Sequence, residues 1–82
     1  MRQFRMYVNG LTLVIKSRVK SYMGNHCGFY VSIYEEGANG VKCNEIKYHF
    51  LTLDRREAED RAVVRYAKRF FGIRGLDVGT IA

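Results

Sequence analysis

The chain has no proline, no apolar run longer than three residues, and no acidic residue among its first 26 positions. Without proline, and with glycine concentrated between periodic segments, the sequence contains no linker or low-complexity tract. A run such as Leu13–Val14–Ile15 is far shorter than the ~20 residues that span a bilayer. Asn9–Gly10 interrupts any signal-peptide core that could follow Arg2 and Arg5. We therefore expect a cytoplasmic protein without a membrane partner.

Cysteine is scarce, and the two present do not make a disulfide scaffold. The strand pairing described below sends Cys27 to the inner face and Cys43 to the outer face, which favours reduced thiols. Together with His26 and His49 they match no standard zinc-ligand spacing. Cys43 and His49 share a face but are about 20 Å apart, too far for a nucleophile and its base. We expect no metal, no cofactor and no enzymatic activity.

Positive charge is concentrated at the amino-terminal end. The net charge is +6, with +5 in residues 1–26, −2 in residues 27–54 and +3 in residues 55–82. A one-sided basic half indicates an anionic partner, most often nucleic acid. A small soluble protein that is merely basic is the alternative.

The 82 residues suit one domain.

Two hairpins are predicted from turn residues between alternating segments. Asn9–Gly10 suits a two-residue type I′ turn, which pairs Val8 with Leu11 and places only apolar pairs on one face. A second turn centred on Ala38–Asn39 pairs Ile33 with Asn44, Val31 with Ile46, Phe29 with Tyr48 and Cys27 with Phe50. Between the hairpins, a loop over 20–26 sets Val19 near Cys27 and Ile15 near Val31. A four-stranded meander follows.

One amphipathic helix is predicted after the strands. Asp54 caps it, Glu57 reaches back as in a capping box, and Gly72 ends it. An apolar stripe runs from Ala58 to Phe70, although Glu59 lies near its middle, a misfit unless the first turn overhangs the sheet edge. The helix should cover the inner face of the sheet.

The fold class is therefore α+β, a four-stranded antiparallel meander with one carboxy-terminal helix packed on one face. We expect strands at about 2–8, 11–20, 27–36 and 41–53, and a helix at about 55–71. The tail over 73–82 is apolar yet glycine-containing, and either adds a short edge strand or packs beside the helix.

The outer sheet face collects basic and aromatic side chains: Arg5, Tyr7, Lys16, Arg18, Lys20, Tyr30, Tyr34, Lys47 and His49. Cations can neutralise phosphates and rings can stack on bases, so this face predicts nucleic-acid binding, with DNA favoured over RNA. The alternatives are a solvated face of good cross-strand neighbours, or a protein interface that forms a homodimer or blocks a larger partner. A second stripe, Arg61, Arg65 and Lys68 flanked by Arg69, lies opposite the apolar side of the helix and favours plain solvation.

Residues 28–70 resemble a known DNA-binding module. The strand Gly28–Tyr34, a glycine turn, a second strand and Asp54-Arg55-Arg56-Glu57-Ala58 resemble the three-stranded-sheet-plus-helix domain of tyrosine-recombinase arms and plant ethylene-response factors. The resemblance implies that the exposed sheet face enters the major groove, with contacts at Tyr30, Ser32, Tyr34, Lys47 and His49. Thr52 stands where that family has a large aromatic residue, and the first strand is additional. Taken with the basic sheet face, we expect a non-enzymatic accessory or regulatory protein of a bacterium, phage or mobile element.

Overall fold

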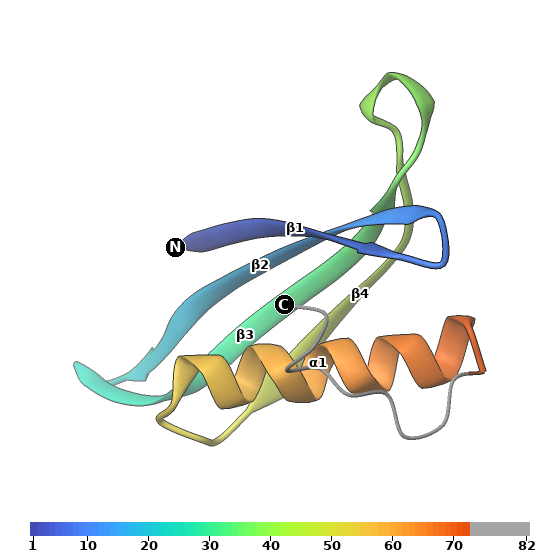
Figure 1. The fold of residues 1–82 in the computed structure, drawn as a ribbon. Helices are drawn as coiled ribbons and strands as arrows, with labels where there is room; N and C mark the ends of the chain where they lie inside the picture. Colours follow the sequence, from blue (N-terminus) through green and yellow to red (C-terminus); the bar gives the residue numbers. More distant parts are fainter. Residues whose placement is uncertain (73–82) are drawn as a thin grey trace.

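A computed structural model describes residues 1–72 and shows four antiparallel strands followed by one helix (Figure 1). The elements are β1 (Arg2–Val8), β2 (Leu11–Tyr22), β3 (Asn25–Glu36), a 3-10 turn (Ala38–Gly40), β4 (Lys42–Phe50) and α1 (Arg55–Phe70). The strands follow one another in the sheet in chain order. The α+β meander predicted from the sequence is confirmed, while the prediction for 73–82 lies outside the described residues.

The first hairpin has the predicted register. Asn9 and Gly10 both have positive φ, 51° and 75°, as a type I′ turn requires. Val8 pairs with Leu11, and the pairing continues without a shift to Arg2 and Ser17. The match of turn chemistry with apolar alternation therefore fixed this part of the sheet.

The next two registers differ from the prediction by two residues. Ile15 pairs with Ile33 rather than Val31, and Val19 with Phe29 rather than Cys27. The cause is a two-residue turn at Met23–Gly24, φ 50° and 81°, which extends both strands into the predicted loop. A shift of two keeps every side chain on its predicted face.

The pairing of β3 with β4 shifts in the same way. Ile33 pairs with Ile46 rather than Asn44, and further along Phe29 pairs with Phe50. An irregularity after Ile33, where Asn44 has φ 53°, absorbs the difference. It also reverses one predicted orientation, because Cys43 pairs with Glu35 and so lies on the same face as the helix.

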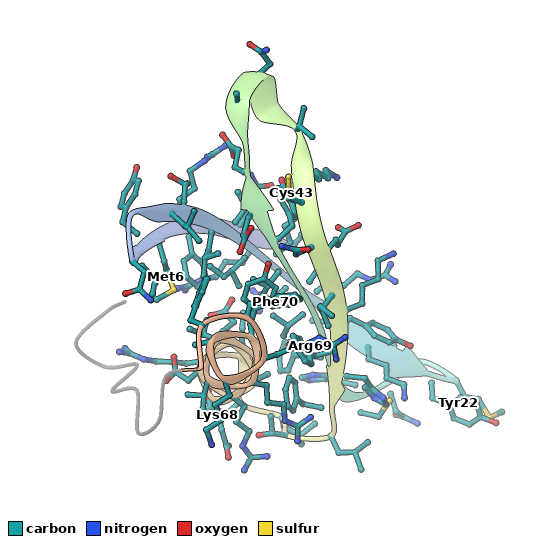
Figure 2. All side chains as sticks on the ribbon, turned by 90° about the vertical axis from the view of Figure 1, so that its right-hand side faces the viewer. Met6, Tyr22, Cys43, Lys68, Arg69 and Phe70 are labelled. Carbon is teal, nitrogen blue, oxygen red and sulfur yellow. The ribbon has the colours of Figure 1, made fainter. Side chains whose placement is uncertain are left out.

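The helix lies against the face that carries the odd-numbered residues of β2 and β3, and Figure 2 shows it end-on beside the sheet. Fully buried side chains from both layers form the core: Leu13, Ile15, Val31, Ile33, Ala58, Ala62, Val63 and Tyr66. The Tyr66 hydroxyl donates to the Asn44 carbonyl oxygen at 2.9 Å. Burial, followed in importance by the charge of Glu35, raises the pKa of this hydroxyl. No helix within residues 1–72 is long and apolar enough to cross a membrane.

The helix ends use the predicted caps with one change of partner. The Asp54 carboxylate accepts from the backbone N–H groups of Arg56 and Glu57. Glu57 does not reach back to Asp54; its carboxylate accepts from the Thr52 hydroxyl at 2.9 Å, and Thr52 Oγ1 in turn accepts from Asp54 N–H. Gly72 follows with φ 64°, the left-handed conformation that suits a residue after a helix.

Glu59, which the sequence marked as a misfit in the apolar stripe unless the first turn overhangs the sheet edge, is only 2% exposed and lies beneath the sheet. Its carboxylate accepts a 2.6 Å hydrogen bond from the Ser17 hydroxyl, which is also buried. Arg2 Nε lies 3.3 Å from the same oxygen. The helix is thus tied to β2 and to the start of β1 by one polar cluster.

Candidate nucleic-acid interface

On the face opposite α1, side chains of β2, β3 and β4 form two rows that run across the strands, with cationic residues on either side of β3. The register sets Lys16 beside Ser32 and Ser32 beside Lys47, and in the next row Arg18 beside Tyr30 and Tyr30 beside His49. We call this surface the cationic face; its members are Lys16, Arg18, Lys20, Tyr30, Ser32, Lys47 and His49. Alternation along the strands is what brings residues from β2, β3 and β4 together here.

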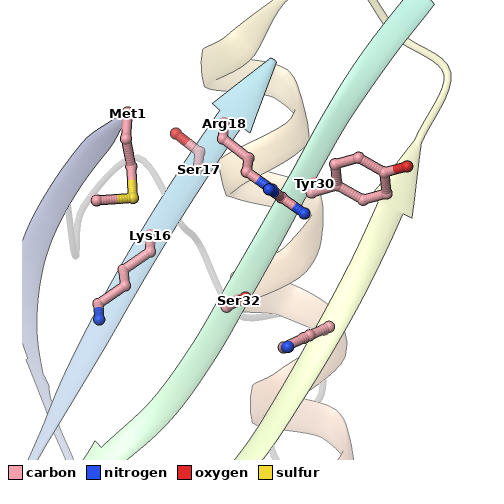
Figure 3. Close-up of a pocket in the computed structure, with 7 residues that line it drawn as sticks. Met1, Lys16, Ser17, Arg18, Tyr30 and Ser32 are labelled. Atoms are coloured by element: carbon pink, nitrogen blue, oxygen red, sulfur yellow. The ribbon is translucent and has the colours of Figure 1, made fainter. Parts of the chain in front are cut away.

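A concavity of about 320 Å³ opens on the cationic face (Figure 3). Lys16 and Arg18 line it from β2, Tyr30 and Ser32 from β3, and Lys47 from β4. Met1 and Ser17 complete the lining, so within the described chain the wall holds three cations and no acid. Such a wall concentrates positive potential, because clefts lined by one sign of charge focus the field.

Tyr30 supports cations rather than presenting a bare ring. The Arg18 guanidinium carbon lies 4.9 Å from the ring centroid and Lys20 Nζ lies 5.9 Å from it. The His49 ring is also adjacent, 5.4 Å between centroids. Stacking or groove contact by Tyr30 stays a prediction from the sequence; the structure places the Arg18 and Lys20 cations and the His49 ring beside it.

Lys20 reaches across the sheet to His49. Its ammonium nitrogen lies 2.8 Å from His49 Nε2, although the two residues belong to strands on opposite sides of β3. Gly28 is opposite Lys20 on β3 and has no side chain to intervene. An ammonium group can only donate, so His49 Nε2 is the acceptor of this contact. Pattern analysis found both residues but not this contact.

Tyr34, predicted to be an exposed ring, is only 6% exposed. Lys16 Nζ and Lys42 Nζ lie over its ring at 5.4 and 5.0 Å, and its β2 neighbour Val14 is fully buried. Long lysine stems cover apolar surface while their charged ends stay in water, which explains the burial. Tyr34 therefore supports the two lysines and offers no stacking surface.

Arg5 and Tyr7 lie away from the concavity, on edge strand β1. Arg5 donates from Nη2 and Nε to the Glu36 carboxylate at 3.0 and 3.2 Å, so an acid already balances its charge. Tyr7 is 76% exposed opposite Thr12, near the first turn. These two predicted residues share the face but not the site.

The arginines of α1 are paired with acids or placed over rings. Arg61 pairs with Glu57, and Arg56 Nε lies 4.0 Å from the Asp60 carboxylate. The Arg65 guanidinium lies 5.0 Å from the Phe50 ring centroid. This arrangement agrees with the solvated helix face expected from the sequence.

The described residues bring together no group of three or more His, Cys, Asp or Glu side chains that could hold a metal. Cys27 and Cys43 are free, and the Cys27 thiol donates to the Lys20 carbonyl oxygen at 3.6 Å. Cys43 faces the helix side, so the expectation that it shares a face with His49 is wrong.

Comparison with protein-family models, with curated proteins and with solved structures found no match to this chain. The resemblance of residues 28–70 to the recombinase-arm and ethylene-response module stays a prediction from the sequence.

Proposed function

We propose that this protein binds nucleic acid, DNA in preference to RNA, through the cationic face, as a non-enzymatic accessory or regulatory protein. The observation that carries the proposal is the concavity whose described wall holds Lys16, Arg18 and Lys47 and no acid. Phosphate neutralisation supplies most of the affinity in such complexes, and it requires cations that an acid has not already paired.

The spacing of the cationic rows suits a duplex groove. Lys16 on β2 and Lys47 on β4 are separated by β3, so their backbones lie about 10 Å apart at two strand spacings. A B-DNA major groove is about 12 Å wide and admits strands, whereas the A-form RNA major groove is too deep and narrow for side chains. This difference favours DNA.

Different residues of the cationic face have different roles in the proposed binding. Lys16 and Lys47 flank the concavity and neutralise phosphates, while Arg18, whose guanidinium carbon lies 4.9 Å from the Tyr30 ring centroid, presents a planar fork to a base edge or a base plane. The Ser32 hydroxyl lies between the two lysines in register and can donate or accept within the same contact.

A homodimer through the same face is disfavoured by the same observations. It would oppose Lys16, Arg18 and Lys47 to their own copies, and like charges across an interface are costly. One of the rings that the interface would have buried, Tyr34, is already covered within the monomer. Gel filtration over a range of concentrations tests this point, and a dimer that is lost on Tyr30→Ala would favour the protein-interface reading.

The test compares two double variants that change net charge equally. Arg18→Glu with Lys20→Glu alters the cationic face, and Arg61→Glu with Lys68→Glu alters the outer side of α1; each lowers the net charge from +6 to +2. Fluorescence anisotropy with a 20-base-pair duplex, measured across a salt series, should show a steep loss of affinity for the first variant alone. Each phosphate contact removed should reduce the slope of log K against log salt by about 0.9.

Equal losses in the two double variants would contradict the proposal, because only overall charge would then matter. Retained affinity in the Arg18 and Lys20 variant would remove the cationic face as the binding surface. Circular dichroism of both variants is the control for folding.

A further inference from the structure

The β2–β3 hairpin projects beyond the rest of the sheet as a two-stranded arm, defined here as residues 20–28. Pairing with β1 ends at Ser17, and pairing with β4 ends at Phe29. Four residues of β3, Asn25 to Gly28, carry the arm about 13 Å past the last β4 pair at Phe29. Figure 1 shows this hairpin reaching past the ends of β1, β4 and α1.

The tip of the arm carries exposed apolar side chains, and the backbone of Met23 has an unfavourable conformation. Tyr22 and Met23 are 70% and 84% exposed, and Met23 has a φ of 50°. The first residue of such a turn is ordinarily Asn, Asp or Gly, as at Asn9 in the first hairpin. The chain therefore places a large apolar side chain in water at a position where asparagine would relieve the backbone.

The arm belongs to the electropositive side of the molecule. An irregularity between Lys20 and Ser21 interrupts the ladder, and bulges of this kind bend a strand pair. Figure 2 shows Tyr22 at the extremity of the molecule, on the side of the sheet away from α1. Arg18 and Lys20 lie at the base of the arm, and no acidic residue precedes Glu35 in the sequence.

We propose that the arm inserts Met23, with Tyr22 beside it, between two base pairs of the duplex held on the cationic face, and so kinks the DNA. This inference rests on the proposed function. Apolar side chains act as such wedges in proteins that bend DNA, because partial unstacking is offset by the contacts that bending permits. A duplex is the occupant favoured by charge, since the cations at the base of the arm neutralise phosphates beside the wedge.

The decisive variant is Met23→Asn, which removes the wedge and should also suit the turn better. A 30-base-pair duplex carries 2-aminopurine to report unstacking and a dye at each end to report bending by energy transfer. Wild-type protein should raise the 2-aminopurine fluorescence and shorten the end-to-end distance. Met23→Asn should lose both signals while its affinity changes by no more than about threefold, because phosphate contacts dominate affinity.

Two measurements separate a lost wedge from a damaged fold. Met23→Asn should melt at a higher temperature than the wild type, which a disruptive variant would not do. Val41→Asn, which replaces another exposed apolar residue (57% exposed) beyond the opposite end of β3, should kink DNA as the wild type does.

The possible results separate the wedge from the proposed DNA binding on which it rests. Wild-type protein that binds without unstacking or bending, or Met23→Asn that still kinks the duplex, would overturn the wedge and leave DNA binding intact. Wild-type protein that fails to bind any duplex would overturn both. A third result is that the wild type binds vesicles containing anionic lipid, Met23→Asn abolishes that binding, and neither protein changes the shape of the duplex. That result would assign the tip to a bilayer surface and overturn the wedge.

Discussion

Replacing Ser17 with alanine should lower the free energy of unfolding by about 2 kcal/mol, because its hydroxyl is the buried donor to the Glu59 carboxylate. Hydrogen bonds to charged groups contribute about 1.5–3 kcal/mol, and both partners are at most 2% exposed. Arg2 also contacts the carboxylate, but its side chain is 56% exposed, so that ion pair adds at most about 1 kcal/mol.

A double-mutant cycle separates this hydrogen bond from simple packing. Glu59→Met alone leaves the Ser17 hydroxyl buried without its acceptor, a cost of about 1–3 kcal/mol. Removing both partners, as Ser17→Ala with Glu59→Met, replaces a polar pair with apolar contacts and should restore stability to near the wild-type value. The expected coupling energy is therefore about 2 kcal/mol or more.

Urea unfolding followed by circular dichroism measures all four corners of the cycle. In a domain of this size, 1 kcal/mol corresponds to a melting-temperature change of about 4–8 °C. Arg2→Gln is the control: its smaller effect should fade in 1 M salt, because a half-exposed pair is screened, whereas the Ser17→Ala effect should persist. Additive single effects, or a loss below about 0.5 kcal/mol for Ser17→Ala, would refute a buried charged hydrogen bond.

Two further predictions concern the sheet and the core. A Cβ at Gly28 would lie 2.2 Å from the Phe50 carbonyl oxygen. Gly28→Ala should therefore destabilise the fold by about 1–3 kcal/mol. An unchanged urea midpoint would contradict this close approach. Burial, followed in importance by the charge of Glu35, raises the pKa of the Tyr66 hydroxyl. Above pH 10, the ordinary pKa of tyrosine, the folded state therefore keeps a proton that the unfolded state releases. Stability should therefore fall as pH rises beyond about 10. Tyr66→Phe should remove part of that decline, leaving the share of Tyr48, whose pKa burial also raises; an identical decline in the variant would exclude Tyr66 as a cause.

The sequence predicted registers only where turn chemistry was unambiguous. Asn9–Gly10 dictates a two-residue turn, and that hairpin matches residue for residue. Met23 gives no such signal, since methionine rarely adopts positive φ, so the segment read as a loop. The irregularity at Asn44 was equally hidden. Along the buried core both errors were shifts of two, because burial of one face forbids a shift of one; only beyond the irregularity at Asn44 does the register differ by one, which turns Cys43 to the other face.

The candidate site was predictable as a set of positions but not as a set of contacts. Alternation alone placed Lys16, Arg18 and Lys47 on one face, and the structure brings them around one concavity. Burial of Tyr34 depends on Lys42 folding over its ring, which no periodicity encodes. The same holds for Glu59, whose partner Ser17 is 42 residues away in the sequence.

The ion pairs explain why binding should centre on β2–β4 rather than on the whole basic half. Arg2 is matched by Glu59 on one side of the sheet and Arg5 by Glu36 on the other, so acids from later in the chain balance both β1 arginines. Lys16 and Arg18 instead lie over aromatic rings, which hold a cation without neutralising it. Because screening confines such fields to about 8 Å at physiological salt, a phosphate near β1 gains less than one over the concavity. Backbone amide shifts on duplex titration should accordingly concentrate on β2, β3 and β4, and a footprint centred on β1 would contradict this assignment.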